Sequence, residues 1–160
     1  MNTKKPKINI DIKNNFRYNI VKEIKQLSVS ERRYGPMGKF VINKTKNDGF
    51  KFNLKAGNGE IIAVSEIYTT EAACENGIES VRKNSAEAKL EDQTVENFEK
   101  LTNPKFEVYK DKAGEFRFRL KARNGEIIAT GEGYKAKESC LNGIDSIRKN
   151  APESPVVKEY

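Results

Sequence analysis

The sequence contains the same structural unit twice, and this duplication restricts the possible folds more than any other feature. Residues 40–84 align with residues 106–150 at a constant offset of 66 without a gap, and about half of the paired residues are identical. Self-similarity of this kind indicates two copies of one supersecondary unit. We therefore expect two related halves that build one domain.

Each unit shows the pattern of a β-hairpin. The first copy alternates apolar and polar residues over 50–56 and 60–65, on either side of Asn58-Gly59, and the second copy does the same 66 residues later. Such alternation indicates half-buried strands. Asn-Gly predicts a two-residue type I′ turn, because both central residues need a positive φ that Gly accepts and Asn tolerates. A further strand is expected before the hairpin, at 39–44 in the first copy.

A helix is expected after each hairpin, at about 70–84 and at about 136–150. The side that would face the core carries mostly small residues, including the mid-helix glycines Gly77 and Gly143. A glycine inside a helix costs about 1 kcal/mol relative to alanine. We therefore expect these glycines to allow a close approach between helix and sheet.

The predicted helix ends differ between the copies. Thr69 or Thr70 can cap the first helix, whereas the second copy has no capping side chain at the same place. Asn84 and Asn150 suit a left-handed C-cap.

A short segment that can form a last strand follows each helix, at 87–92 and at 154–158. The linker at 93–104 is longer than a turn requires. It carries Val95, Phe98 and Leu101, which are spaced to form one amphipathic turn that covers part of the core.

Three motifs recur in both copies, namely Leu-Lys-Ala-x-Asn-Gly-Glu-Ile-Ile, Glu-x-Tyr and Asn-Gly-Ile-x-Ser-Val/Ile-Arg-Lys-Asn. Through these motifs, residues 37–158 resemble the YegP-like family of small bacterial proteins. The resemblance implies an α+β fold of two tandem β-β-β-α-β repeats, at about 39–92 and 105–158. The repeats would share one antiparallel sheet, place both helices on one face and exchange their C-terminal strands. The resemblance supplies no catalytic motif and no function.

Residues 1–36 look like a basic extension of the repeated domain at 37–160. They carry nine Lys/Arg and three Asp/Glu, a net charge of +6, which leaves +1 of the total +7 for the repeated domain. The basic pI is therefore poor evidence that the repeats bind nucleic acid. The extension contains one short helical pattern, at 19–27.

The origin of this extension has two interpretations. Residues Glu31 to Tyr34 can be encoded by GAA-AGG-AGG-TAT, which contains a bacterial ribosome-binding sequence at a normal start distance from Met37. Residues 1–36 are then an untranslated leader read as protein. Alternatively they are a disordered basic tail, natural or artificial. The codons at Arg32 and Arg33 decide between these interpretations.

The composition argues against an enzyme. The sequence contains no histidine, which removes Ser/His and Cys/His pairs and the commonest metal ligand. We expect no catalytic site, no cofactor and no metal. Cys74 and Cys140 occupy equivalent helix positions and are expected in the core. The sequence does not decide whether they form a disulfide. No apolar run has the length of a signal peptide or a membrane span, so we expect a cytoplasmic protein without membrane association.

The best candidate for a functional surface is a basic strand in the second copy. Four basic residues alternate there with apolar ones, so they share the face opposite the core. Residues of both copies join this face by the same alternation. The candidate interaction surface comprises Arg117, Arg119, Lys121, Arg123, Tyr109, Lys51, Lys55, Ile62 and Ile128.

The expected hairpin register neutralises part of this charge. With a two-residue turn at Asn124-Gly125, Arg123 and Arg117 each face a glutamate across the hairpin. Arg119 and Lys121 then have no partner within the hairpin.

Two functions fit such a face. A protein-interaction module is favoured, because isoleucines and the aliphatic stems of Lys and Arg can receive a partner protein. The alternative is weak binding of RNA or single-stranded nucleic acid through the basic residues. We expect the full-length chain to be mainly monomeric, because each half already supplies the strand that the other lacks.

Overall fold

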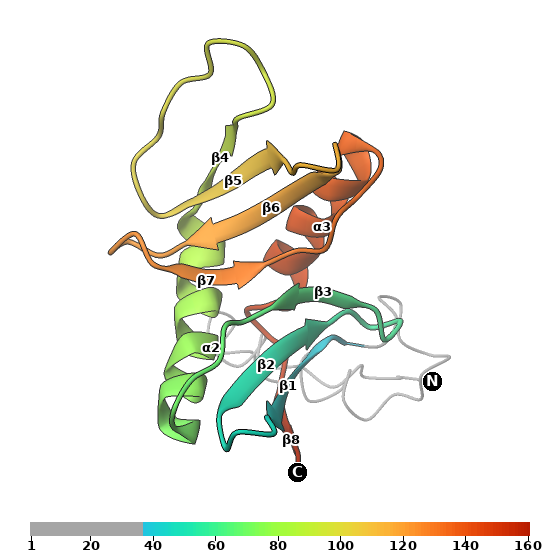
Figure 1. Ribbon diagram of the computed structural model, residues 1–160. Coiled ribbons are helices and arrows are strands. Elements are labelled where there is room, and N and C mark those ends of the chain that lie inside the picture. Colours follow the sequence, from blue (N-terminus) through green and yellow to red (C-terminus); the bar gives the residue numbers. More distant parts are fainter. Residues whose placement is uncertain (1–36) are drawn as a thin grey trace, which may run out of the picture. The chain divides into compact units, whose positions relative to one another are not determined.

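The computed structural model describes residues 37–160, in which each repeat forms three strands, a helix and a last strand (Figure 1). The elements in chain order are β1 (Lys39–Lys44), β2 (Phe50–Lys55), β3 (Ile61–Val64), α2 (Glu71–Glu87), β4 (Lys89–Asp92), β5 (Lys105–Lys110), β6 (Phe116–Lys121), β7 (Ile127–Thr130), α3 (Lys137–Asn150) and β8 (Val156–Glu159). The helix expected at 19–27 and both interpretations of residues 1–36 lie outside the described residues. Neither helix within 37–160 has the length and apolar character needed to cross a membrane.

The eight strands form one sheet in the order β4-β5-β6-β7-β3-β2-β1-β8. The last strand of each repeat lies at a sheet edge beside the first strand of the other repeat, since β4 pairs with β5 and β8 pairs with β1. The α+β fold and the strand exchange are thus confirmed. The sheet is mixed rather than wholly antiparallel, because both exchanged strands run parallel to their neighbours. A hairpin imposes antiparallel pairing, but each last strand follows a helix and is free of that constraint.

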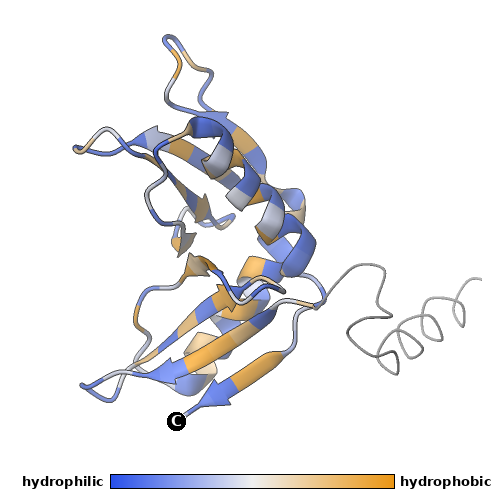
Figure 2. Ribbon diagram, turned by 90° about the vertical axis from the view of Figure 1, so that its right-hand side faces the viewer, coloured by the Kyte–Doolittle hydropathy of each residue, from blue (hydrophilic) through white to orange (hydrophobic). Residues whose placement is uncertain are grey.

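One hydrophobic core joins the sheet to both helices. Apolar and polar residues alternate along the strands (Figure 2), and the apolar side chains pack together with the buried residues of α2 and α3. Phe40 lies edge-on to Phe52 with 5.7 Å between ring centroids, and Phe106 lies edge-on to Phe118 at 6.3 Å. The alternation in the sequence therefore places matching aromatic pairs in the two halves.

The glycine in each helix makes room for the tyrosine of the Glu-x-Tyr motif. A Cβ atom on Gly77 would lie 2.3 Å from the hydroxyl oxygen of Tyr68, and one on Gly143 would lie 2.8 Å from that of Tyr134. The expected close approach of helix and sheet is confirmed, and the two motifs are explained together. A side chain at either glycine would displace the tyrosine beneath it.

The N-terminal caps of both helices agree with the prediction, but the C-terminal caps do not. Thr70 caps α2 by accepting the N–H three residues on at 3.1 Å, and α3 has no side-chain cap, as expected. Asn84 and Asn150 were expected as left-handed C-caps, which is wrong. Each asparagine stays helical and donates its side-chain N–H to the carbonyl oxygen one turn earlier, of Ser80 and Ser146, at 2.8 Å.

An arginine on each helix holds the strand that the other repeat supplies. Arg82 of α2 donates to the carbonyl oxygen of Ser154, just before β8, at 2.6 Å. Arg148 of α3 donates to the carbonyl oxygen of Ala88, just before β4, at 3.0 Å. Both guanidinium groups also lie over a buried phenylalanine ring. The recurring Arg-Lys-Asn motif thus contributes to the exchange.

The Asn-Gly turns differ from the predicted type I′ geometry. Gly59 and Gly125 have φ of 88° and 86°, whereas neither Asn58 nor Asn124 has a positive φ. A type I turn followed by a left-handed glycine closes a three-residue loop and inserts a bulge. Both hairpins accordingly shift register just before the turn. The type I′ prediction is therefore wrong, and side-chain alternation does not continue unbroken around the turn.

Candidate binding surface

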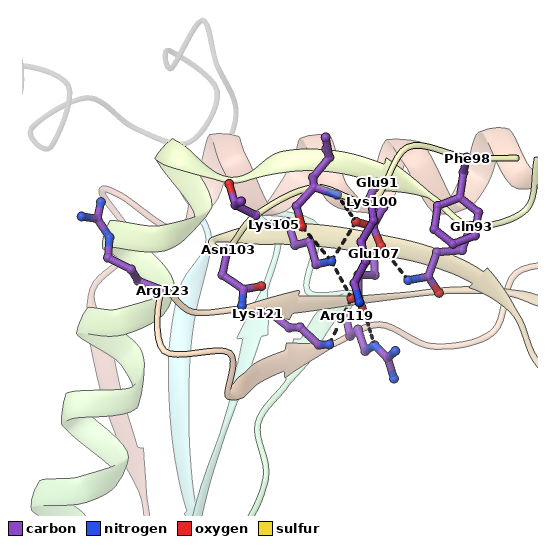
Figure 3. Close-up of a pocket in the computed structure, with 12 residues that line it drawn as sticks. Glu91, Gln93, Phe98, Lys100, Asn103, Lys105, Glu107, Arg119, Lys121 and Arg123 are labelled. Carbon is purple, nitrogen blue, oxygen red and sulfur yellow. Dashed lines mark hydrogen bonds and ion pairs between the residues drawn. The ribbon is translucent and has the colours of Figure 1, made fainter.

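A cluster of charged side chains lies on the face of the second repeat that points away from the core (Figure 3). The strand register places Glu91 of β4 beside Glu107 of β5 and Glu107 beside Arg119 of β6, while Lys105 lies beside Lys121. We call these five residues the charge cluster. Its two glutamates are each 2 % exposed and Lys105 is 4 % exposed. Charges buried to this degree need partners.

The cluster is linked by ion pairs. The Nζ of Lys105 lies 2.7 Å from Oε2 of Glu91 and 3.2 Å from Oε1 of Glu107. Glu107 also accepts from Nε of Arg119 and pairs with Nζ of Lys121 at 3.0 Å. One carboxylate therefore contacts three cations, and the cluster as a whole carries one excess positive charge.

The hydrogen bonds keep the two glutamates of the cluster ionised. Burial alone would raise the pKa of Glu91, but bonds from Lys105, Gln93 and the Leu101 N–H outweigh it and lower the pKa to about 2. Burial likewise opposes ionisation of Glu107, whose pKa is lowered by its three cationic partners. A general acid or base works best with a pKa near the working pH. The glutamates are therefore permanent charges rather than proton-transfer groups.

The linker at 93–104 is fastened to the cluster. The N–H of Leu101 donates to Oε2 of Glu91 at 2.6 Å, and the carbonyl oxygen of Leu101 accepts from Nζ of Lys105 at 3.1 Å. Gln93 donates to Oε1 of Glu91 at 2.8 Å. The linker thus packs over the charged face of the sheet.

The expected amphipathic turn in this linker is wrong, because Val95 and Phe98 are 47 % and 39 % exposed. The linker instead forms one wall of an open pocket of about 780 Å³, which we call the groove. The groove is lined by Glu91, Gln93, Phe98, Lys100, Leu101, Thr102, Asn103, Lys105, Glu107, Arg119, Lys121 and Arg123. Five cationic side chains and two carboxylates face it, an excess of three positive charges.

The first repeat keeps the two lysines of the charge cluster, as Lys39 and Lys55, but has neither its glutamates nor its arginine. Its exchanged strand pairs Val41 with Val157, where the second repeat pairs Glu107 with Glu91. The offset of 66 also places Asn53 at the position of Arg119. Our sequence reasoning missed the buried residues of the cluster. A position-by-position comparison of the two copies could have revealed them, because it shows where charged residues replace uncharged ones.

Three of the predicted surface residues line the groove, namely Arg119, Lys121 and Arg123. The guanidinium of Arg119 lies over the Tyr109 ring at 5.0 Å from its centroid. These three residues therefore lie together along the groove, and their role in binding stays a prediction.

The expected partners of two arginines are wrong. Arg117 pairs with Asp111 at 2.6 Å and lies outside the groove, and Arg123 pairs with Glu87 of α2 at 2.9 Å. Asp111 and Glu87 both come from outside this hairpin, and they replace the expected partners across it.

The apolar part of the predicted surface is buried. Ile62 and Ile128 are 7 % and 5 % exposed and belong to the core, so their assignment to an open face is wrong. The bulges explain this error, because an extra residue shifts the side-chain alternation. Lys51 and Lys55 are half-buried on β2 of the first repeat and do not line the groove.

The two cysteines are free thiols in the core, as the sequence indicated. Burial raises the pKa of both Cys74 and Cys140 to about 11, which keeps them protonated. Within residues 37–160, no three His, Cys, Asp or Glu side chains are placed to hold a metal ion.

Comparison with known proteins identifies the family. The sequence model of a domain of unknown function, DUF1508, matches residues 45–92 and 111–157, once in each repeat. The chain belongs to the DUF1508 family. The UPF0339 protein YegP of Yersinia pestis is 42 % identical over 123 residues, which cover 77 % of this chain and 96 % of that protein. The expected membership of the YegP-like family is thus confirmed.

Further relatives match either about one repeat or most of this chain. A UPF0339 protein of Treponema denticola is 65 % identical over 54 residues, which cover 34 % of this chain and 93 % of that protein, about the length of one repeat. The solution NMR structure of E. coli yegP, a protein of unknown function, is 34 % identical with a TM-score of 0.63. The aligned region covers 78 % of this chain and 94 % of the E. coli chain.

Proposed function

We propose that this protein is a non-enzymatic, mainly monomeric and cytoplasmic interaction module that binds a partner protein through the groove. One observation carries the proposal: the charge cluster occurs in only one of two otherwise similar repeats. The first repeat makes the same strand exchange with Val41 and Val157, so the fold does not require the cluster. Replacing a buried ion pair by apolar residues is often neutral or stabilising. A binding role explains why the second repeat has glutamates there.

The groove also has the composition of a protein interface. Arginine and aromatic residues are frequent among side chains that dominate binding energy. Arg119 and Arg123 line the groove, and Phe98 is partly exposed on the linker wall. Because the linker is tied to the sheet through Leu101, the groove is formed before a partner arrives, which lowers the entropic cost of binding.

Nucleic-acid binding is the second candidate, favoured by the excess of positive charge in the groove. Single-stranded nucleic acids bind through aromatic rings on which bases stack, in addition to basic residues. Phe98 is the one aromatic side chain among the residues that line the groove. The groove therefore suits a partner that forms ion pairs better than one that stacks.

Affinity capture from native lysate tests the proposal. The bait is the full chain, compared with the double variant Arg119→Gln/Lys121→Gln and with the control Arg117→Gln, which removes a charge from the same strand outside the groove. We expect a captured protein that resists nuclease treatment, is lost with the double variant and is kept with the control. Capture that disappears with nuclease supports the second candidate, and capture unchanged by the double variant refutes the groove as the site.

A further inference from the structure

We infer that the groove binds an acidic peptide segment whose carboxylates pair with Arg119 and Lys121. This inference rests on the proposed function and adds the chemistry of the partner. The two carboxylates of the groove, Glu91 and Glu107, already have hydrogen-bond and ion-pair partners within the protein. Glu91 accepts bonds from Lys105, Gln93 and Leu101, so a ligand meets the cations.

Arg119 and Lys121 both line the groove, and Arg119 keeps unused hydrogen-bond donors there. Arg119 uses only Nε for Glu107, and its terminal nitrogens have no hydrogen-bond partner among the described residues. The side chain of Arg119 is 31 % exposed and that of Lys121 is 25 % exposed. A guanidinium group binds carboxylates through two parallel hydrogen bonds. Both side chains are also held in place by Glu107, so little side-chain entropy is lost on binding.

The surroundings of the groove favour a peptide over a nucleic acid. The exposed linker residues Glu96 and Glu99 repel any anion that runs along the linker, so the carboxylates of the ligand have to lie at Arg119 and Lys121. The linker wall contributes Phe98 and Leu101, which offer apolar contact to a peptide. Lys100 adds a cation on this wall. Localised positive charge between apolar side chains complements a peptide with a few carboxylates.

Direct binding tests the inference. A fluorescein-labelled oligoglutamate peptide is titrated with the full chain, followed by fluorescence anisotropy, with oligoglutamine and oligouridylate of equal length as comparison ligands. Removing either charge, in Arg119→Gln or Lys121→Gln, should weaken oligoglutamate binding about tenfold, because hydrogen bonds between charged groups are among the strongest. Arg119→Lys keeps the charge but cannot form two parallel hydrogen bonds. Its affinity for oligoglutamate should therefore lie between those of the wild type and Arg119→Gln.

Two further variants separate binding from folding. Lys100→Gln changes an exposed residue of the linker wall and should weaken binding while leaving thermal unfolding unchanged. Arg117→Gln lies outside the groove and should bind like the wild type. The inference is overturned if oligoglutamate does not bind, if all variants bind it equally, or if oligouridylate binds more tightly with the same dependence on Arg119.

The proposed function and the acidic partner can be refuted separately. If oligoglutamate does not bind but a nuclease-resistant protein is still captured through Arg119 and Lys121, the acidic partner is wrong and the interaction module stands. If capture is independent of both residues, the groove is not the binding site and both ideas fail.

Discussion

Glu91 offers the sharpest test of the charge cluster, because its contribution to stability should depend on pH. We expect Glu91→Gln to destabilise the protein at neutral pH. Glutamine has nearly the same shape but no charge for Lys105, and it changes the acceptor of the Leu101 N–H. The loss should therefore weaken both the buried pair and the attachment of the linker.

The size of the effect follows from the pKa of Glu91, which falls from 4.5 to about 2 in the folded protein. At about 1.4 kcal/mol for each pKa unit, the ionised carboxylate stabilises the fold by at most about 3–4 kcal/mol. For a domain of this size that corresponds to a decrease in the melting temperature of about 10 °C. Because the folded pKa is depressed, this stabilisation is present above about pH 4.5 and disappears as the pH falls through 2.

The assay is thermal unfolding followed by circular dichroism from pH 7 down to pH 2. The difference between variant and wild type isolates Glu91 from other titrating groups, and it should shrink steadily as the pH falls below 4.5. Glu99→Gln, on the exposed part of the same linker, is the control and should melt like the wild type at every pH. Equal melting temperatures at pH 7, or a deficit that does not change with pH, would refute the reasoning.

Three further predictions concern the doubled fold. Residues 104–160 expressed alone should form a homodimer, because β8 of each copy can then pair with β5 of the other, the strand that corresponds to β1. A cooperatively folded monomer at micromolar concentration, measured by light scattering, contradicts this. Cys74 and Cys140 should react slowly with a thiol reagent in native protein and quickly after unfolding, and rapid native labelling would exclude their core placement. Gly77→Ala should destabilise the protein by about 1–3 kcal/mol through the clash with Tyr68, measured by chemical denaturation, and Tyr68→Phe should recover part of the loss.

The repeat made most of the fold predictable. Two aligned copies with the same alternation fix the number and order of elements, and Gly77 and Gly143 predicted the close approach of helix and sheet. The turn geometry was not predictable from the Asn-Gly pair, since the same dipeptide serves a type I turn with a bulge. That single difference shifted the register and misplaced Ile62 and Ile128.

The candidate site was predictable only in part. Alternation along β6 identified Arg119 and Lys121, because both lie on one strand. Their partner Glu107 lies on a neighbouring strand, and the remaining contact to Glu91 depends on the parallel pairing of β4 with β5. Long-range register of this kind leaves no periodic trace in a sequence.

The pairing of β1 with β8 also constrains how the chain is made. The first repeat emerges from the ribosome as a sheet with an open edge along Phe40 to Asn43, because its neighbour there, Val156 to Glu159, belongs to the second repeat and is synthesised later. An unpaired strand edge is a template for association with other chains. The nascent protein therefore completes this edge only after Val156 to Glu159 have been synthesised, and crowded translation of this gene should favour strand exchange between neighbouring chains.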